Sequence, residues 1–363
     1  MAASEISKWQ TQLAEDAGIS LSAVAKQIRA QVTRPQRQRD PVGYKDAFLD
    51  DYQPNQSAYL SESIRQDLAQ EGHVGASQLP AGTYVRKVLD RWLIDLSWNS
   101  SRLEGNTYSI LEAQRLLELG EASDGKATVE AQMLLNHKAA IELLADQVDE
   151  IGFNHYTICN LHALLADNLM PDPDSCGRIR ERSVGIAASV YYPPEGHLRI
   201  KERFNVFLEK AEAIENPFEQ AFFAMVHLPY LQAFEDVNKR VSRLAANIPL
   251  VRHNLCPLSF VDVPQSDYVH AILGVYELNR IEYLREVFVW PTNARQCAAR
   301  PCAKRSASQT LFAYSIGTSS TPACAKSCSK ITPKQRPAQV SRPLHTSWLQ
   351  MLEHNSYKSS RSN

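Results

Sequence analysis

The amino-acid sequence predicts a mainly α-helical protein, and two observations lead to this prediction. From Thr83 onward, apolar residues return every three or four positions, which is the spacing of one helix face, first over residues 85–98 and again over 131–148. Only one stretch, residues 182–192, alternates and is rich in Val and Ile like a β-strand. We therefore expect a helical domain with a single short β-hairpin.

The composition excludes membrane-spanning proteins. A chain of 363 residues with 44% hydrophobic residues can bury a sizeable core. No stretch approaches the roughly 18 uninterrupted apolar residues that a transmembrane helix needs. The first residues, MAASEISKWQ, show neither the basic nor the apolar region of a secretory signal, so a cytoplasmic location is expected.

Charge is distributed unevenly, although the formal net charge is only -1. Residues 291–363 carry 11 basic residues and a single acid, Glu353, and show no sustained apolar period. This segment is predicted to be a disordered basic tail. It is either a nucleic-acid-binding arm or the product of a reading-frame change that replaced a C-terminal helix. The second interpretation is favoured because Pro291 interrupts the helical pattern.

The first 39 residues predict a helix-turn-helix. Residues 13–28 have its spacing, with Gly18 in the turn and Ser20 capping the second helix. The basic segment 29–39 follows, so DNA binding through residues 13–39 is expected. Two ordinary amphipathic helices would give the same pattern.

The remaining elements follow in order. Residues 40–83 are rich in Pro, Gln, Asp and Gly and are predicted to be a linker. Residues 84–290 then form the main domain, with the hairpin between its helices. Helices are expected at 85–98, 131–148, 155–170, 200–214, 218–231, 238–251 and 267–290.

The segment LQAFEDVNKRVSR, residues 231–243, has the pattern of a phosphate-binding loop. An aromatic anchor before a loop that enters a helix would leave backbone N–H groups pointing at one spot. Asp236 could hold Mg²⁺, and Arg240 and Arg243 would lie one turn apart. The alternative is a surface helix with ordinary ion pairs, such as Glu235 with Lys239.

This segment resembles the signature loop of Fic-domain proteins: His-Pro-Phe, any residue, Asp or Glu, Gly, Asn, Gly or Lys, Arg, two residues, Arg. Residues 100–109, SSRLEGNTYS, resemble the inhibitory helix of the same family. The expected hairpin, Val184 to Pro194, lies where the family carries its target-docking flap. The matching residues are Phe234, Asp236, Asn238, Lys239, Arg240 and Arg243 in the loop, and Ser100, Glu104 and Gly105 in the inhibitory motif.

The resemblance covers roughly residues 84–290 and implies the Fic fold, a helical bundle with a short β-hairpin flap. It also implies transfer of AMP from ATP to a protein hydroxyl. Mg²⁺ would be held by Asp236, and Glu104 would inhibit by reaching Arg243. The nucleotide would be bound by Val237, Asn238, Lys239, Arg240 and Arg243.

Three departures from the family pattern affect the expected chemistry. Gln232 stands at the position of the catalytic His, Ala233 at that of Pro, and Val237 at that of the first loop Gly. A Gln amide cannot accept a proton, so general-base catalysis should be missing. His227 lies in an apolar helix and is expected to be a core residue rather than a substitute base.

These observations leave three functional hypotheses. The first is an adenylyltransferase homologue acting on an unknown target protein, inactive or strongly impaired by Gln232 and inhibited by Glu104. The second is a DNA-binding regulator that uses its Fic-like domain as a nucleotide sensor or for homodimerisation. In the third, Gln232 supports a different phosphate transfer that needs only orientation and a metal.

Overall fold

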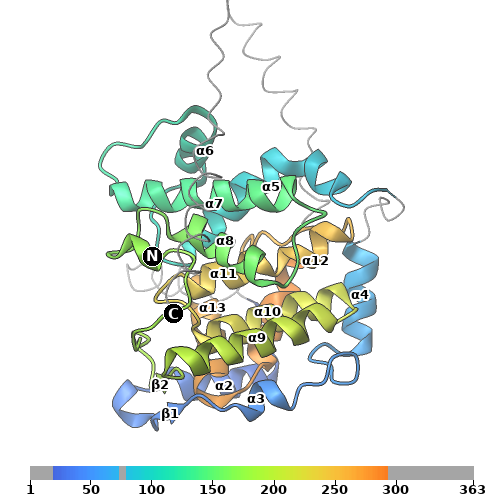
Figure 1. Cartoon of the computed structure of the whole chain (residues 1–363), viewed down its shortest axis with the longest axis vertical. Coiled ribbons are helices and arrows are strands. Elements are labelled where there is room, and N and C mark those ends of the chain that lie inside the picture. The colour runs from blue at the N-terminus through green and yellow to red at the C-terminus, as the bar shows by residue number, and fades with distance from the viewer. Residues whose placement is uncertain (1–18, 73–78, 293–363) are drawn as a thin grey trace, which may run out of the picture. The chain divides into compact units, whose positions relative to one another are not determined.

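The computed structural model describes residues 19–72 and 79–292, which belong to one compact unit (Figure 1). It confirms a mainly helical fold. The helices that build it are α2 (Ala23–Val32), α3 (Ala47–Asp50), α4 (Glu62–Gly72), α5 (Thr83–Arg102), α6 (Ile110–Leu119), α7 (Thr128–Asp146), α8 (His155–Ala166), α9 (His197–Ala213), α10 (Pro217–Leu231), α11 (Asn238–Ala245), α12 (Asn247–Arg252), α13 (Gln265–Leu278) and α14 (Glu282–Thr292). Short 3-10 turns lie at Gln36–Gln38 and Pro173–Ser175.

Helix α10 lies in the centre of the helical bundle. All its residues from Phe218 to Leu231 are buried, as expected for a helix that is apolar on every side. The Asn216 side chain caps its first turn, and Pro217 occupies the first helical position. Helices α9, α11, α12 and α13 pack around it, so the signature loop at its C-terminal end lies inside the bundle.

A second group of helices carries the inhibitory motif. Helix α5 packs lengthwise on α7, and α7 packs on α8, which in turn contacts α11 (Figure 1). The end of α5 is thereby held close to the start of α11. Helices α5 and α7 lie where they were expected, because both have continuous apolar stripes in the sequence.

Only part of the expected helix-turn-helix lies within the described residues. Helix α2 buries Ala25, Ile28 and Val32 and packs against α13 and α14. Its N-cap is Ser22, whose side chain accepts from the backbone N–H of Ala25; the expected cap, Ser20, was wrong. Residues 13–18, where the first helix and the turn at Gly18 were expected, lie outside the described residues.

The segment expected to be a linker contains helices and is tied to α10 by a buried carboxylate. Glu219 accepts hydrogen bonds from the hydroxyl of Tyr52 and from the backbone N–H groups of Tyr59 and Leu60. Helix α4 then packs on α10 and α14. Residues 40–72 therefore contribute to the same core as the main domain.

The expected hairpin at Val184 to Pro194 is not formed. Its one strand, β2 (Tyr191–Tyr192), pairs in parallel with β1 (Val42–Gly43) from the N-terminal part of the chain, and the two strands lie beside α2 (Figure 1). The sequence pattern identified an extended segment but not its distant partner. Pro193 and Pro194 end the strand because proline cannot donate a ladder hydrogen bond.

Three other helix boundaries differ from expectation. The helix expected over 267–290 is broken by Asn279, which adopts a left-handed conformation with φ of 51° and separates α13 from α14. The helix expected over 238–251 is divided at Ala246 into α11 and α12. Helix α8 ends at Ala166 instead of continuing to residue 170.

Among the described residues, none of the helices has the length and apolar character required to cross a membrane. Helix α14 includes Pro291 and Thr292 at its C-terminal end. The remainder of the expected basic tail, residues 293–363, lies outside the described residues.

Candidate active site

The signature loop connects α10 to α11 and lies between two residues with left-handed backbone conformations. Gln232 ends α10 with φ of 50°, and Val237 precedes α11 with φ of 67°. A β-branched residue rarely takes this conformation, because its side chain crowds the neighbouring backbone. The loop therefore keeps a turn that suits glycine although Val237 occupies it.

Gln232, at the position of the family's catalytic His, is buried and has hydrogen bonds at both ends of its amide. Its Nε2 donates to the carbonyl of Pro229 at 2.8 Å and to the hydroxyl of Tyr276 at 3.1 Å. Its Oε1 accepts from Nδ2 of Asn238 at 3.0 Å. The side chain is fixed within the protein and offers no basic group.

Asn238 stabilises the loop from inside. Its Nδ2 also donates to the carbonyl of Phe234 at 2.9 Å, and its Oδ1 accepts from the backbone N–H of the same residue at 3.0 Å. The Phe234 ring stacks on His162 with a centroid separation of 4.0 Å. The expected aromatic anchor is thus present, with His162 of α8 beneath it.

Arg180 attaches the segment around β2 to the loop. Its side chain is buried and donates to three carbonyl groups, those of Gln232 at 2.6 Å, Arg182 at 2.9 Å and Pro194 at 2.5 Å. Its backbone N–H donates to the carbonyl of Ala233 at 3.0 Å. Arg180 therefore holds both ends of the segment 182–194, where the hairpin was expected, against the turn at Gln232.

The inhibitory motif contacts α11 through Glu104. One carboxylate oxygen lies 2.7 Å from Nη2 of Arg243 and the other 2.8 Å from Nζ of Lys239. Arg243 also donates from Nε to the Ser100 hydroxyl at 2.9 Å and from Nη2 to the Ser100 carbonyl at 3.1 Å. Gly105 follows with φ of 94°. We call this set of contacts the Glu104–Arg243 lock; Lys239 pairs with Glu104 rather than with Glu235.

The electrostatic environment keeps Glu104 ionised. Burial alone would raise the pKa of its carboxyl, but the cations of Arg243 and Lys239 outweigh burial and lower the pKa to about 2. Because Arg243 is fully buried, its charge depends on this carboxylate for compensation.

Two guanidinium groups of the loop helix retain unused donors. Nη1 of Arg240 and Nη1 of Arg243 are buried without a hydrogen-bond partner among the described residues. Asp236 differs from them: its side chain is 73% exposed, and Arg240 approaches it only to 3.7 Å. Guanidinium N–H groups without a partner could bind a phosphate, and an exposed carboxylate beside them could bind its divalent metal. Glu104 already occupies Nη2 of the Arg243 guanidinium.

His227 is a core residue, as expected. Its ring is buried, its Nε2 lies 2.8 Å from the Tyr59 hydroxyl, and burial lowers its pKa to about 3. It faces the segment before α4 rather than the loop.

Several residues that support the site were not expected from the sequence: His137, His162, Arg180 and Tyr276. His137 contacts Ser100, and Tyr276 contacts Gln232. All lie within apolar helices or an unremarkable loop, where no spacing signals a role. Only the packing of distant helices brings them to the site.

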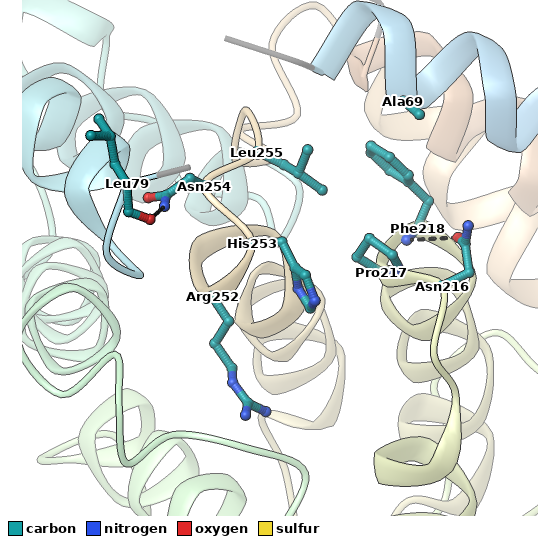
Figure 2. A pocket seen from close by; sticks show the side chains of 9 residues that line it. All are labelled: Ala69, Leu79, Asn216, Pro217, Phe218, Arg252, His253, Asn254 and Leu255. Atoms are coloured by element: carbon teal, nitrogen blue, oxygen red, sulfur yellow. Dashed lines mark hydrogen bonds between the residues drawn. The ribbon is translucent and has the colours of Figure 1, made fainter. Parts of the chain in front are cut away.

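A separate cavity of about 370 Å³ lies away from the loop. Figure 2 shows the start of α10, with Asn216 and Phe218, facing the end of α12, with Arg252 and His253. None of its lining residues belongs to the signature loop or to the inhibitory motif.

The helical bundle, the loop between α10 and α11, and the Glu104–Arg243 lock define a protein of the Fic type. Residues 152–250 match the Fic/DOC family, which confirms the resemblance seen in the sequence. The chain therefore contains a Fic domain.

Curated relatives agree with this assignment. Protein adenylyltransferase fic-1 of Caenorhabditis elegans is 26% identical over 208 residues, which cover 56% of this chain and 40% of the relative. Protein adenylyltransferase Fic of Drosophila melanogaster is 27% identical over 175 residues, 48% of this chain and 35% of the relative. The chain thus spans less than half the length of these relatives.

Solved structures show the same fold. A Fic family protein from Desulfovibrio desulfuricans G20 superposes with a TM-score of 0.55 at 20% identity, over 68% of this chain and 77% of the other. A variant of C. elegans Fic-1 superposes with a TM-score of 0.50 at 18% identity, over 69% and 72% of the two chains.

Proposed function

We propose that this protein is a homologue of Fic-type protein adenylyltransferases whose transfer activity is absent or strongly impaired. The main support is the state of Gln232, an amide that cannot accept a proton and whose polar atoms are all engaged by Pro229, Tyr276 and Asn238. A target hydroxyl would find no general base there, which removes a contribution of about 10² to 10⁴-fold.

The nucleotide-binding parts of the site are better preserved. The unused donors of Arg240 and Arg243 would bind phosphate oxygens, and exposed Asp236 would hold Mg²⁺. The bound metal would neutralise phosphate charge. Lys239 and Asn238 lie on the first turn of α11, where Lys239 would add positive charge and Asn238 would keep the loop shaped.

The Glu104–Arg243 lock would oppose nucleotide binding, because one carboxylate already takes the cations of Arg243 and Lys239. Calorimetric titration of ATP with Mg²⁺ into the wild type and Glu104→Gly tests this directly. We expect clearly tighter binding to Glu104→Gly. Equal affinities would disprove the lock, and absence of binding to both proteins would disprove the nucleotide site.

DNA binding is a second candidate function, favoured by the outer surface of α2 and the residues that follow it. From Ala23 to Arg39 the chain has no acidic residue, and Lys26, Arg34 and Arg37 are exposed. Another basic residue of this segment, Arg39, instead forms a buried ion pair with Glu277 at 2.6 Å.

Reversing the charge of Lys26, Arg34 and Arg37 to Glu tests this function in the full chain. The control reverses three exposed cations elsewhere, Lys87, Arg178 and Lys201. If α2 contacts DNA, only the first triple variant loses duplex binding, and the binding of the wild type weakens steeply with salt. Equal losses in both triple variants would contradict it.

A further inference from the structure

His137 is a buried histidine of α7 that contacts the inhibitory motif. Its Nδ1 lies 2.8 Å from the Met133 carbonyl, and its Nε2 lies 2.8 Å from the Ser100 hydroxyl. The Ser101 hydroxyl is also near Nδ1, at 3.3 Å. The ring is completely buried, so its nitrogen atoms contact these protein groups and are not exposed to solvent.

These partners determine where the proton of the ring lies. A carbonyl oxygen can only accept, so Nδ1 carries the proton and donates to Met133. A neutral ring then has an acceptor at Nε2. Burial, the largest effect, and the cations Arg240 and Arg243 outweigh the hydrogen bond to Met133 and the charge of Glu104, and together they lower the pKa of His137 to about 3. The ring is therefore neutral at physiological pH.

The neutral ring in turn orients Ser100. The Ser100 hydroxyl donates its only hydrogen to Nε2 of His137, which directs its oxygen lone pairs toward Nε of Arg243, 2.9 Å away. Hydrogen bonds therefore run in one direction from Arg243 through Ser100 and His137 to the Met133 carbonyl. The same guanidinium presents Nη2 to Glu104 at 2.7 Å.

We infer that His137 is a positioning residue for the Glu104–Arg243 lock: by accepting from the Ser100 hydroxyl it fixes that oxygen as an acceptor for Arg243 and so aims the guanidinium at Glu104. Its effect on nucleotide binding rests on the function proposed above. The hydrogen-bond arrangement itself does not.

The arrangement is tested first in the wild-type chain by ¹⁵N NMR with labelled histidine, assigned by the signal lost in His137→Gln. We expect His137 to show a protonated Nδ1 and an unprotonated Nε2, with no titration between about pH 8 and 5. A protonated Nε2, or titration near the ordinary pKa of histidine, would overturn the inference without any variant.

Two variants then test the effect on Arg243. His137→Gln keeps an acceptor for Ser100 and a donor for Met133, whereas His137→Phe keeps an aromatic ring and removes both. The Nε–H of Arg243 should exchange with solvent roughly tenfold faster in His137→Phe, the effect of one net hydrogen bond, and at nearly the wild-type rate in His137→Gln. Equal rates in the two variants would overturn the inference.

Titration of ATP with Mg²⁺ supplies the functional readout. His137→Phe should tighten binding in the otherwise wild-type chain, by up to about tenfold, because the lock is loosened by one hydrogen bond. It should have no such effect in the Glu104→Gly background, where the lock is already gone. Equal tightening in both backgrounds would contradict the inference. Absence of ATP binding to every variant would refute the proposed nucleotide site, while the NMR results would still decide the role of His137.

Discussion

The Nδ2 group of Asn238 donates a hydrogen bond to Oε1 of Gln232 across the signature loop, at 3.0 Å. The amide of Gln232 thereby joins the two ends of the loop, the end of α10 and the start of α11. Gln232, at the position of the family's catalytic His, thus stabilises the conformation of the signature loop. The proposed loss of transfer activity is therefore compatible with an intact loop at this position.

Relief of the lock alone should not produce an active enzyme. Glu104→Gly frees Arg243 and Lys239 but supplies no base, so we expect no transfer of labelled AMP to the protein itself or to proteins of a cell lysate. A thermal unfolding measurement controls for stability. Detectable transfer by this single variant would refute the proposal of an impaired site.

Restoring the base in the relieved protein should restore some activity. In Gln232→His with Glu104→Gly, an imidazole replaces the amide beside Asn238 and Tyr276, and we expect AMP transfer above the level of Glu104→Gly alone. The matched control is Gln232→Asn with Glu104→Gly, which keeps an amide and should stay silent. Silence of the histidine variant as well would indicate that Val237 also prevents the reaction.

Val237 should tolerate replacement by glycine better than other buried valines. Its φ of 67° is unfavourable for a β-branched residue, and glycine removes that strain, worth about 1–2 kcal/mol. Val263 is also buried in a loop but has no positive φ. We expect urea unfolding to show that Val237→Gly loses about 1–2 kcal/mol less free energy of unfolding than Val263→Gly. Equal losses would show that Val237 is unstrained.

Stability should fall with decreasing pH below the ordinary pKa of histidine. Burial lowers the pKa of His137 to about 3, of His162 to about 4 and of His227 to about 3, against a usual value of 6.5. The unfolded chain therefore binds more protons between these values, and the stabilising contribution of each neutral ring, complete above pH 6.5, is lost as the pH falls toward its folded pKa.

Each of these protons contributes a slope of about 1.4 kcal/mol per pH unit. Urea unfolding at several pH values between about 7 and 4 measures how the free energy of unfolding depends on pH. In His227→Gln this slope should be smaller by the contribution of one proton. An unchanged slope in His227→Gln would mean that its ring is protonated in the folded protein.

Local sequence patterns predicted the parts of the fold and site that depend on local order. The apolar patterns located α5, α7 and α10, and the resemblance to the Fic inhibitory motif implied the contact between Glu104 and Arg243. The sequence could not show which distant segments contact one another. The extended residues near Tyr191 pair with Val42, and His137 lies beside Ser100, only because helices far apart in the chain pack together.

The parallel pairing of Val42–Gly43 with Tyr191–Tyr192 has a consequence for choosing the boundaries of a shortened protein. A fragment that begins at Thr83, where the apolar periodicity starts, or at 152, where the family match starts, would lack β1. It would also lack Arg39, the cation that compensates buried Glu277. Such fragments would expose a bare strand edge and a buried uncompensated carboxylate, so poor solubility or altered behaviour would reflect the cut rather than the Fic domain. Fragments that retain residues from Ala23 onward avoid both defects.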